Sequence, residues 1–73
     1  MTLDEVPTGH RATITRVTTG AGVTLRLMEL GMVPGRALRV LKRAPFGGPM
    51  QLEFPGFRLS VRAGEARAFE VEA

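Results

Sequence analysis

The hydrophobic residues of this chain fall mostly in short runs that alternate with polar residues, which is the pattern of half-buried β-strands. The clearest run is FRLSVR, where Phe57, Leu59 and Val61 alternate with two arginines and a serine. β-Branched and aromatic residues, which favour strands, are frequent in four further runs. The pattern therefore predicts a mainly β protein of about five strands, at residues 11–17, 36–43, 50–54, 57–62 and 68–72.

Glycine and proline separate these runs at short intervals, as expected for strands joined by tight turns. Pro55-Gly56 is a dipeptide typical of such a turn. Thr2 and Glu5 have the spacing of a capping box, which predicts a single helical turn at the start of the chain. Residues 63–66 are expected to form one 3₁₀ turn. Five short strands in so small a chain favour a closed or nearly closed barrel, because closure removes exposed strand edges.

One segment, residues 23–32, has the spacing of a helix instead. Its sequence, VTLRLMELGM, predicts a helix of two to three turns between the first two strands, with Gly31 near its C-terminal cap. At ~100° per residue, one apolar stripe on this helix is formed by Val23, Leu27 and Leu30. We expect this stripe to pack against the barrel.

A second apolar stripe, formed by Leu25, Met28 and Met32, lies on nearly the opposite side of the predicted helix. One interpretation is a surface that binds a partner, because methionine is unbranched and adapts to different contacts. The other is that the N-terminal turn, with Leu3 and Val6, folds over the stripe and buries it. The pattern leaves both interpretations open.

The loop at residues 44–49, APFGGP, places an aromatic residue between two prolines and beside a pair of glycines. Phe46 at its tip is a candidate anchor for a pocket on a partner. The alternative is that Phe46 folds back onto the barrel, and we prefer it because a lone phenylalanine buries readily. The loop has no Gly-Lys-Ser/Thr sequence, so it does not match a phosphate-binding P-loop.

The composition indicates one small domain spanning residues 1–73, near the lower size limit for a hydrophobic core. The formal net charge of +3 is compatible with an acidic partner or a nucleic acid. No apolar run approaches the ~20 residues that a membrane-spanning helix requires. The first residues, MTLDEVPTG, do not have the apolar stretch of a signal peptide. We therefore expect a cytoplasmic protein.

The sequence offers little that could perform catalysis or hold a metal. It has no cysteine, and His10 and Ser60 are its single histidine and serine. Neither has a recognisable acid–base partner or a second ligand at the spacing of a metal site. We therefore expect no enzyme, no bound metal and no cofactor.

Nucleic acid is the alternative partner, because small barrels bind single strands through a basic groove with stacking aromatic residues. The chain has arginines on two expected strands, but it has no tryptophan or tyrosine. Its remaining aromatic residues at Phe54, Phe57 and Phe69 fall on the inward-facing sets of the strand pattern. The missing stacking surface makes this the weaker alternative.

Two segments at a characteristic spacing, RLMELGMVPG at residues 26–35 and APFGGP at 44–49, resemble the ferrous iron transport protein A (FeoA) family. The resemblance extends from about Leu3 to Val71. It implies an SH3-like barrel with a helix inserted after the first strand, in agreement with the strand pattern. It also implies a small cytoplasmic accessory of FeoB, a membrane GTPase and ferrous iron transporter, acting on the cytosolic part of FeoB without inserting into the membrane.

The resemblance supplies no catalytic, cofactor or metal residue. Its glycines have the character of structural positions, and its leucines, Leu27 and Leu30, that of core residues. The expected working surface is therefore what remains outside the core. We expect it to dock on the cytosolic domain of FeoB and modulate it. A homodimer formed through an open barrel edge or through the Leu25/Met28 stripe is a further option. The candidate residues are Leu25, Arg26, Met28, Met32, Arg39, Phe46, Gly47 and Gly48.

Overall fold

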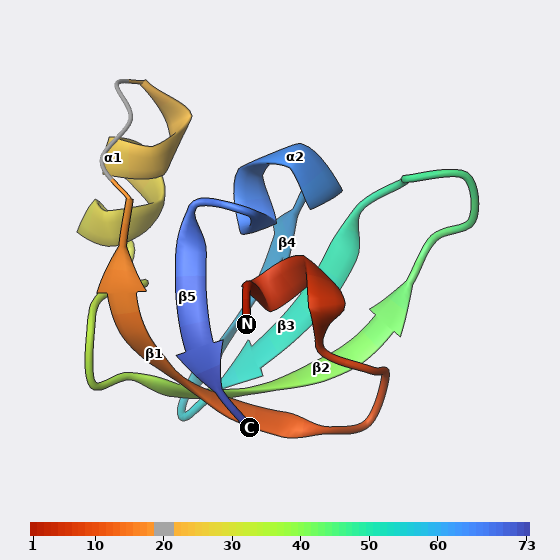
Figure 1. The fold of residues 1–73 in the computed structure, drawn as a ribbon, viewed down its shortest axis with the longest axis horizontal. Helices are drawn as coiled ribbons and strands as arrows, with labels where there is room; N and C mark the ends of the chain where they lie inside the picture. The colour runs from red at the N-terminus through yellow and green to blue at the C-terminus, as the bar shows by residue number, and fades with distance from the viewer. Residues whose placement is uncertain (19–21) are drawn as a thin grey trace.

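The computed structural model describes residues 1–18 and 22–73, which form a strongly curved antiparallel sheet with three short helical segments (Figure 1). The five strands lie close to the predicted positions. In chain order the elements are η1 (Leu3–Glu5), β1 (Arg11–Val17), α1 (Val23–Glu29), β2 (Ala37–Arg43), β3 (Met50–Phe54), β4 (Phe57–Val61), α2 (Ala63–Ala66) and β5 (Phe69–Glu72).

The strands form one sheet in the order β4-β3-β2-β1-β5, and every neighbouring pair is antiparallel. The register shifts once between β1 and β5 and once between β2 and β3. Such irregularities increase the local twist, so they help the sheet to wrap around its core. This is the expected small mainly β barrel with a helix inserted between the first two strands, and β4 and β5 are its two edges.

The core lies inside the curve of the sheet and follows the predicted alternation. In β3, Met50, Leu52 and Phe54 are buried, whereas Gln51 is exposed and Glu53 is half-buried. The buried apolar residues are Leu3, Val6, Ala12, Ile14, Leu27, Met32, Leu38, Val40, Met50, Leu52, Phe54, Val61, Ala66, Phe69 and Val71.

The N-terminal turn η1 packs against α2 and β5 and supplies Leu3 and Val6 to the core. Its Glu5 carboxylate accepts the backbone N–H of Thr2 at 2.8 Å, as the capping box predicts. The residues before it continue the sheet, because Thr2 bridges Glu70 and the N–H of Val71 donates to the carbonyl of Met1 at 2.8 Å. The interpretation in which this turn buries the second helix stripe is wrong for Leu25, which is exposed, whereas Met32 is buried in the same core as Leu3 and Val6.

Residues 63–66 form one α-helical turn, not the predicted 3₁₀ turn. The difference is in the hydrogen bonding, because the N–H of Ala66 donates to the carbonyl of Arg62, four residues earlier, at 2.9 Å. The Glu65 carboxylate accepts the N–H of Arg62 at 3.0 Å, so this turn begins with the same side-chain contact as η1.

The helix α1 ends at Glu29, three residues before the predicted end. The N–H groups of Gly31 and Met32 donate to the carbonyls of Met28 and Leu27, both at 3.0 Å. This is the hydrogen-bond pattern of a Schellman cap, and Gly31 takes the positive φ of 120° that the cap needs. In such a cap the residue after the glycine contacts the last turn of the helix, and here that residue, Met32, is fully buried with Leu27.

Candidate functional site

The helix α1 packs on the barrel through Thr24 and Leu27, which are buried, and Met28, which is half-buried against the core. The expected packing stripe is therefore correct for Leu27 and wrong for Val23 and Leu30, whose exposed fractions are 48% and 53%. On a helical projection the observed packing face is rotated by roughly 90° from the predicted one. The Schellman cap explains the rotation, because it seats Met32 in the core and turns Leu30 toward solvent.

The opposite face of α1 is an exposed surface of mixed character. Leu25 has an exposed fraction of 56% and lies nearly opposite the buried Leu27 on the helical projection. Arg26 is exposed on the same side, between Leu25 and Leu30 on the helical projection. We call Val23, Leu25, Arg26 and Leu30 the helix patch. The helix patch contains two of the predicted binding residues, Leu25 and Arg26. A third, Met28, lies outside the patch and is half-buried against the core.

The loop between β2 and β3, residues 44–49, forms a tight turn that we call the tip loop. The N–H of Gly48 donates to the carbonyl of Pro45 at 3.2 Å, and the N–H of Ala44 donates to the carbonyl of Pro49 at 3.0 Å. The two central residues, Phe46 and Gly47, have φ values of 59° and 72°. Positive φ at both central positions is the requirement of a type I′ turn. A Cβ on Gly48 would lie 2.6 Å from the Cβ of Ala44, so only glycine fits there.

Phe46 projects fully into solvent from the tip loop, with an exposed fraction of 103%. The preferred expectation that it folds back onto the barrel is therefore wrong, because the type I′ geometry directs its side chain away from the strands. Within residues 1–18 and 22–73 it is also the only non-glycine residue with a positive φ. A bulky side chain in this region of φ costs about 1–2 kcal/mol. The turn therefore presents an aromatic ring that stabilises nothing within the described chain.

The structure places the predicted binding residues in separate parts of the molecule. The helix α1 and the tip loop lie on opposite sides of the barrel (Figure 1). Met32 is fully buried, so it is a core residue and not a surface contact. Arg39 lies on β2, on the outer face of the sheet, where its guanidinium pairs with Glu53 at 3.1 Å. The exposed candidates therefore lie on the helix patch, on the tip loop and at Arg39 on the outer face of the sheet.

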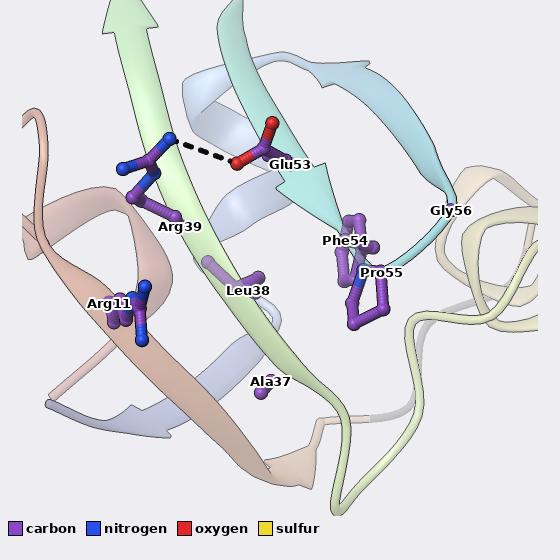
Figure 2. Close-up of a pocket in the computed structure, with 8 residues that line it drawn as sticks. All are labelled: Arg11, Ala37, Leu38, Arg39, Glu53, Phe54, Pro55 and Gly56. Atoms are coloured by element: carbon purple, nitrogen blue, oxygen red, sulfur yellow. Dashed lines mark hydrogen bonds and ion pairs between the residues drawn. The ribbon is translucent and has the colours of Figure 1, made fainter.

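The charged position belongs to a groove on the outer face of the sheet (Figure 2). The groove has a volume of about 490 Å³, and Arg11, Arg39 and Glu53 contribute its charged groups. Arg11 and Glu53 were not among the predicted site residues. The sequence shows that both lie on strands, but the pairing of Arg39 with Arg11 on one side and with Glu53 on the other depends on the register.

The aromatic residues do not provide a stacking surface for nucleic acid in the described part of the chain, apart from the isolated Phe46. Phe54 and Phe69 are buried. Phe57 is half-buried and stacks on Phe54, with ring centroids 4.8 Å apart and an interplanar angle of 4°. No group of three or more His, Asp or Glu side chains in residues 1–18 and 22–73 is arranged to hold a metal ion. None of the described helices is long and apolar enough to cross a membrane.

One carboxyl group has a clearly perturbed titration. The backbone N–H of Thr2 donates to Glu5 at 2.8 Å and the Thr2 hydroxyl donates at 3.0 Å, and these bonds lower the pKa of Glu5 below its ordinary value of 4.5. This group caps η1 and lies outside the helix patch, the tip loop and the groove, so its role is structural.

Comparison with known proteins gives a consistent family. Two solved structures with this fold are the FeoA protein from Chlorobium tepidum and the zinc-complexed FeoA of Stenotrophomonas maltophilia, which is described as an SH3 domain protein. The first is 41% identical with a TM-score of 0.87, and the match covers 97% of this chain and 68% of that one. The second is 30% identical with a TM-score of 0.75, and the match covers 99% of this chain and 89% of that one.

A third relative is much longer than this chain. It is the Fe(2+) transport protein A/Fe(2+) transporter FeoB fusion protein of Porphyromonas gingivalis (strain ATCC BAA-308 / W83). It is 37% identical over 73 residues, which are 99% of this chain and 8% of the fusion protein. The FeoA domain family itself matches residues 1–73. With its SH3-like barrel, its inserted helix and this match over the whole length, the chain belongs to the FeoA domain family.

Proposed function

We propose that this protein is a non-catalytic accessory of ferrous iron uptake that docks on the cytosolic, GTPase-containing part of an FeoB transporter and modulates it. The observation that carries the proposal is the fusion relative, in which a domain 37% identical to this chain is joined to FeoB in one polypeptide. Joining two domains raises their effective concentration to about the millimolar range, which favours even a weak contact between them. A separate chain that makes the same contact needs a surface with enough affinity of its own.

The tip loop supplies such a surface. Aromatic residues that enter a pocket on the partner commonly dominate the energy of protein interfaces. Phe46 is fully exposed, and two backbone hydrogen bonds of the turn fix the backbone on either side of it. Because the loop is ordered before binding, less conformational entropy is lost in the complex. We therefore assign Phe46 the role of anchor, with Gly47 and Gly48 as the residues that shape the turn.

The helix patch is the second candidate contact. Leu25 and Leu30 expose apolar surface on either side of Arg26, and exposed apolar surface often marks contact with a partner. It lies on the other side of the barrel from the tip loop (Figure 1). The two surfaces can therefore be tested independently, because a substitution in one does not contact the other.

The test is isothermal titration of the intact chain with the cytosolic domain of its cognate FeoB, with and without a GTP analogue. We expect Phe46→Ala to weaken binding by roughly 30-fold, equivalent to about 2 kcal/mol for an anchor residue. Leu25→Ser tests the helix patch in the same titration, since it also removes an exposed apolar side chain. A loss of binding only in Leu25→Ser would move the contact to α1.

Absence of binding by the unmodified chain would refute the docking proposal. Sedimentation of the chain alone over a concentration series tests for a homodimer. If Phe46→Ala abolished self-association and FeoB had no effect, the anchor would serve a homodimer instead. GTP hydrolysis by the FeoB domain, measured with and without the chain, then reports whether docking raises or lowers its activity.

A further inference from the structure

A row of four charged side chains crosses the outer face of the sheet from β1 to β4. The strand registers place Arg11 opposite Arg39, Arg39 opposite Glu53, and Glu53 opposite Arg58. Glu53 accepts one guanidinium at each of its oxygens, from Arg39 at 3.1 Å and from Arg58 at 3.5 Å. The row therefore contains three guanidinium groups and one carboxylate, which pairs with Arg39 and Arg58.

Arg11 and Arg39 are residues of like charge that lie directly opposite each other on β1 and β2. The carbonyl of His10 accepts the N–H of Val40 at 3.0 Å, and the N–H of Ile14 donates to the carbonyl of Arg36 at 3.0 Å. Hydrogen-bonded and non-hydrogen-bonded pairs alternate along antiparallel strands, so these bonds assign Arg11 and Arg39 to a non-hydrogen-bonded pair. In such pairs the Cα atoms are only about 4.5 Å apart, and like charges directly opposite each other are destabilising.

None of the ion pairs in the part of the chain that the structure describes includes Arg11, and Glu53 pairs with Arg39 and Arg58 instead. In the described residues, the repulsion between Arg11 and Arg39 is thus offset only by the pairing of Arg39 with Glu53. An external anion placed between their guanidinium groups would relieve it. Guanidinium groups bind carboxylates through two parallel hydrogen bonds, which gives such a contact both strength and direction.

The two arginines line a groove that has room for such an anion and for its neighbours in a chain. Its volume is about 490 Å³, and Ala37, Pro55 and Gly56 provide small or rigid residues beside the charged groups. Figure 2 shows Arg39 reaching along the sheet toward Glu53, while Ala37 and Pro55 lie further toward the β3–β4 turn. The groove thus joins a charged end to a largely apolar end.

We propose that this groove binds an extended acidic segment of a partner protein, with one carboxylate between Arg11 and Arg39 and an adjacent apolar side chain against Ala37 and Pro55. Charge complementarity favours a peptide with a single well-placed carboxylate over a nucleic acid. Glu53 lies in the same row and repels a second negative charge, and the groove has no exposed aromatic ring on which a base could stack. This site does not rest on the docking of Phe46 to FeoB.

The experiment is a ¹⁵N NMR titration of the intact chain with the capped pentapeptide Gly-Val-Glu-Leu-Gly, compared with the same peptide carrying glutamine in place of glutamate. We expect shifts of the Arg11 and Arg39 side-chain N–H signals and of the Ala37 and Gly56 amides with the glutamate peptide. Its affinity should fall when the salt concentration is raised to 0.5 M, since added salt screens ion pairs. Equal binding of the two peptides would overturn the proposal.

Variants separate the site from a general effect of positive charge. Arg11→Gln should weaken binding of the glutamate peptide by about fivefold or more, because it removes one of two charge-assisted contacts. Arg16→Gln is the matched control, since Arg16 lies on the same strand but pairs with Glu70 at 3.7 Å. Equal losses in both variants would contradict a specific site.

Glu53→Gln tests the proposal in the opposite direction. It removes the repelling carboxylate and frees Arg39, so we expect binding of the glutamate peptide to become roughly two- to threefold tighter, the size of an exposed charge effect. A misfolded variant could not produce this gain. Unchanged or weaker binding would overturn the assignment of Glu53. Parallel titrations with inorganic phosphate and a single-stranded oligonucleotide complete the test, because tighter binding of either at the same arginines would refute a peptide site.

Discussion

Replacing Phe46 with asparagine should stabilise the protein, although phenylalanine is the larger hydrophobic residue. The ring is fully exposed, so its removal costs no burial energy. The backbone at this position has a φ of 59°, which asparagine tolerates better than phenylalanine. If about half of the 1–2 kcal/mol cost of this conformation is relieved, the free energy of unfolding rises by about 0.5–1 kcal/mol. For a domain of this size that corresponds to an increase in Tm of roughly 2–8 °C.

Phe46→Ala is the control that separates the ring from the backbone. Alanine keeps the Cβ that makes the conformation unfavourable, so its stability should stay within about 0.3 kcal/mol of the unmodified chain. Urea denaturation and thermal unfolding, followed by circular dichroism, give the free energy of unfolding and the Tm of the unmodified chain and of the two variants. If Phe46→Ala lost more than about 1 kcal/mol, the ring would be buried in solution and the reasoning refuted. If Phe46→Asn brought no gain, the strain would be absent.

Three further predictions concern the helix cap and the N-terminal turn. Gly31→Ala should lower the free energy of unfolding by about 1–2 kcal/mol, because φ is 120° and the added Cβ would lie 3.2 Å from the Phe57 ring. Urea denaturation measures this loss, and an unchanged midpoint would contradict the cap. Met32→Ala should cost about 2–5 kcal/mol by the same measurement, as expected for a core side chain, and a loss below about 1 kcal/mol would argue for a surface role. The lowered pKa of Glu5 predicts that its carboxylate stabilises the fold above pH 4.5 and that this contribution is lost as the pH falls through the folded-state value. The stability difference between the unmodified chain and Glu5→Gln, measured from pH 3 to 7, should therefore shrink at the acidic end, and a constant difference would refute the linkage.

The strands could be predicted from sequence because their pattern is local. Alternation in the β3 and β4 segments identifies both the strand and its buried face. Glycine and proline mark the positions of the turns between strands. The helical insertion also has a local signal in its spacing. Each of these features depends on neighbours within a few residues, which is the range over which a sequence pattern carries information.

The face of α1 was predicted wrongly because its orientation depends on how the chain leaves the helix. The sequence contained the signal, since a glycine after a helix predicts a cap in which the next residue packs back on the last turn. Applied to Gly31, this rule places Met32 against Leu27 and assigns Met32 to the core. The second apolar stripe, with Leu25 and Met28, includes Met32 only if the helical spacing continues through Gly31. Because α1 ends at Glu29, Met32 lies beyond the cap and does not follow that spacing.

The exposure of Phe46 and the row of arginines could not be predicted for a different reason. Burial of Phe46 depends on the turn type, and the type I′ geometry follows from the spacing between β2 and β3. The pairing of Arg11, Arg39 and Glu53 depends on the register of three strands. A shift of one residue in either pair would move these side chains to opposite faces of the sheet.

The bridge between Thr2 and Glu70 also bears on how this protein avoids aggregation. An open strand edge is a template for pairing with another molecule. At β5 that template is already taken, because Met1 and Thr2 pair with the strand from within the same chain. At the other edge, β4 carries the exposed, charged Arg58. Met1 and Thr2 therefore block edge-to-edge association at β5, and losing their pairing with this strand would favour oligomers that grow from it.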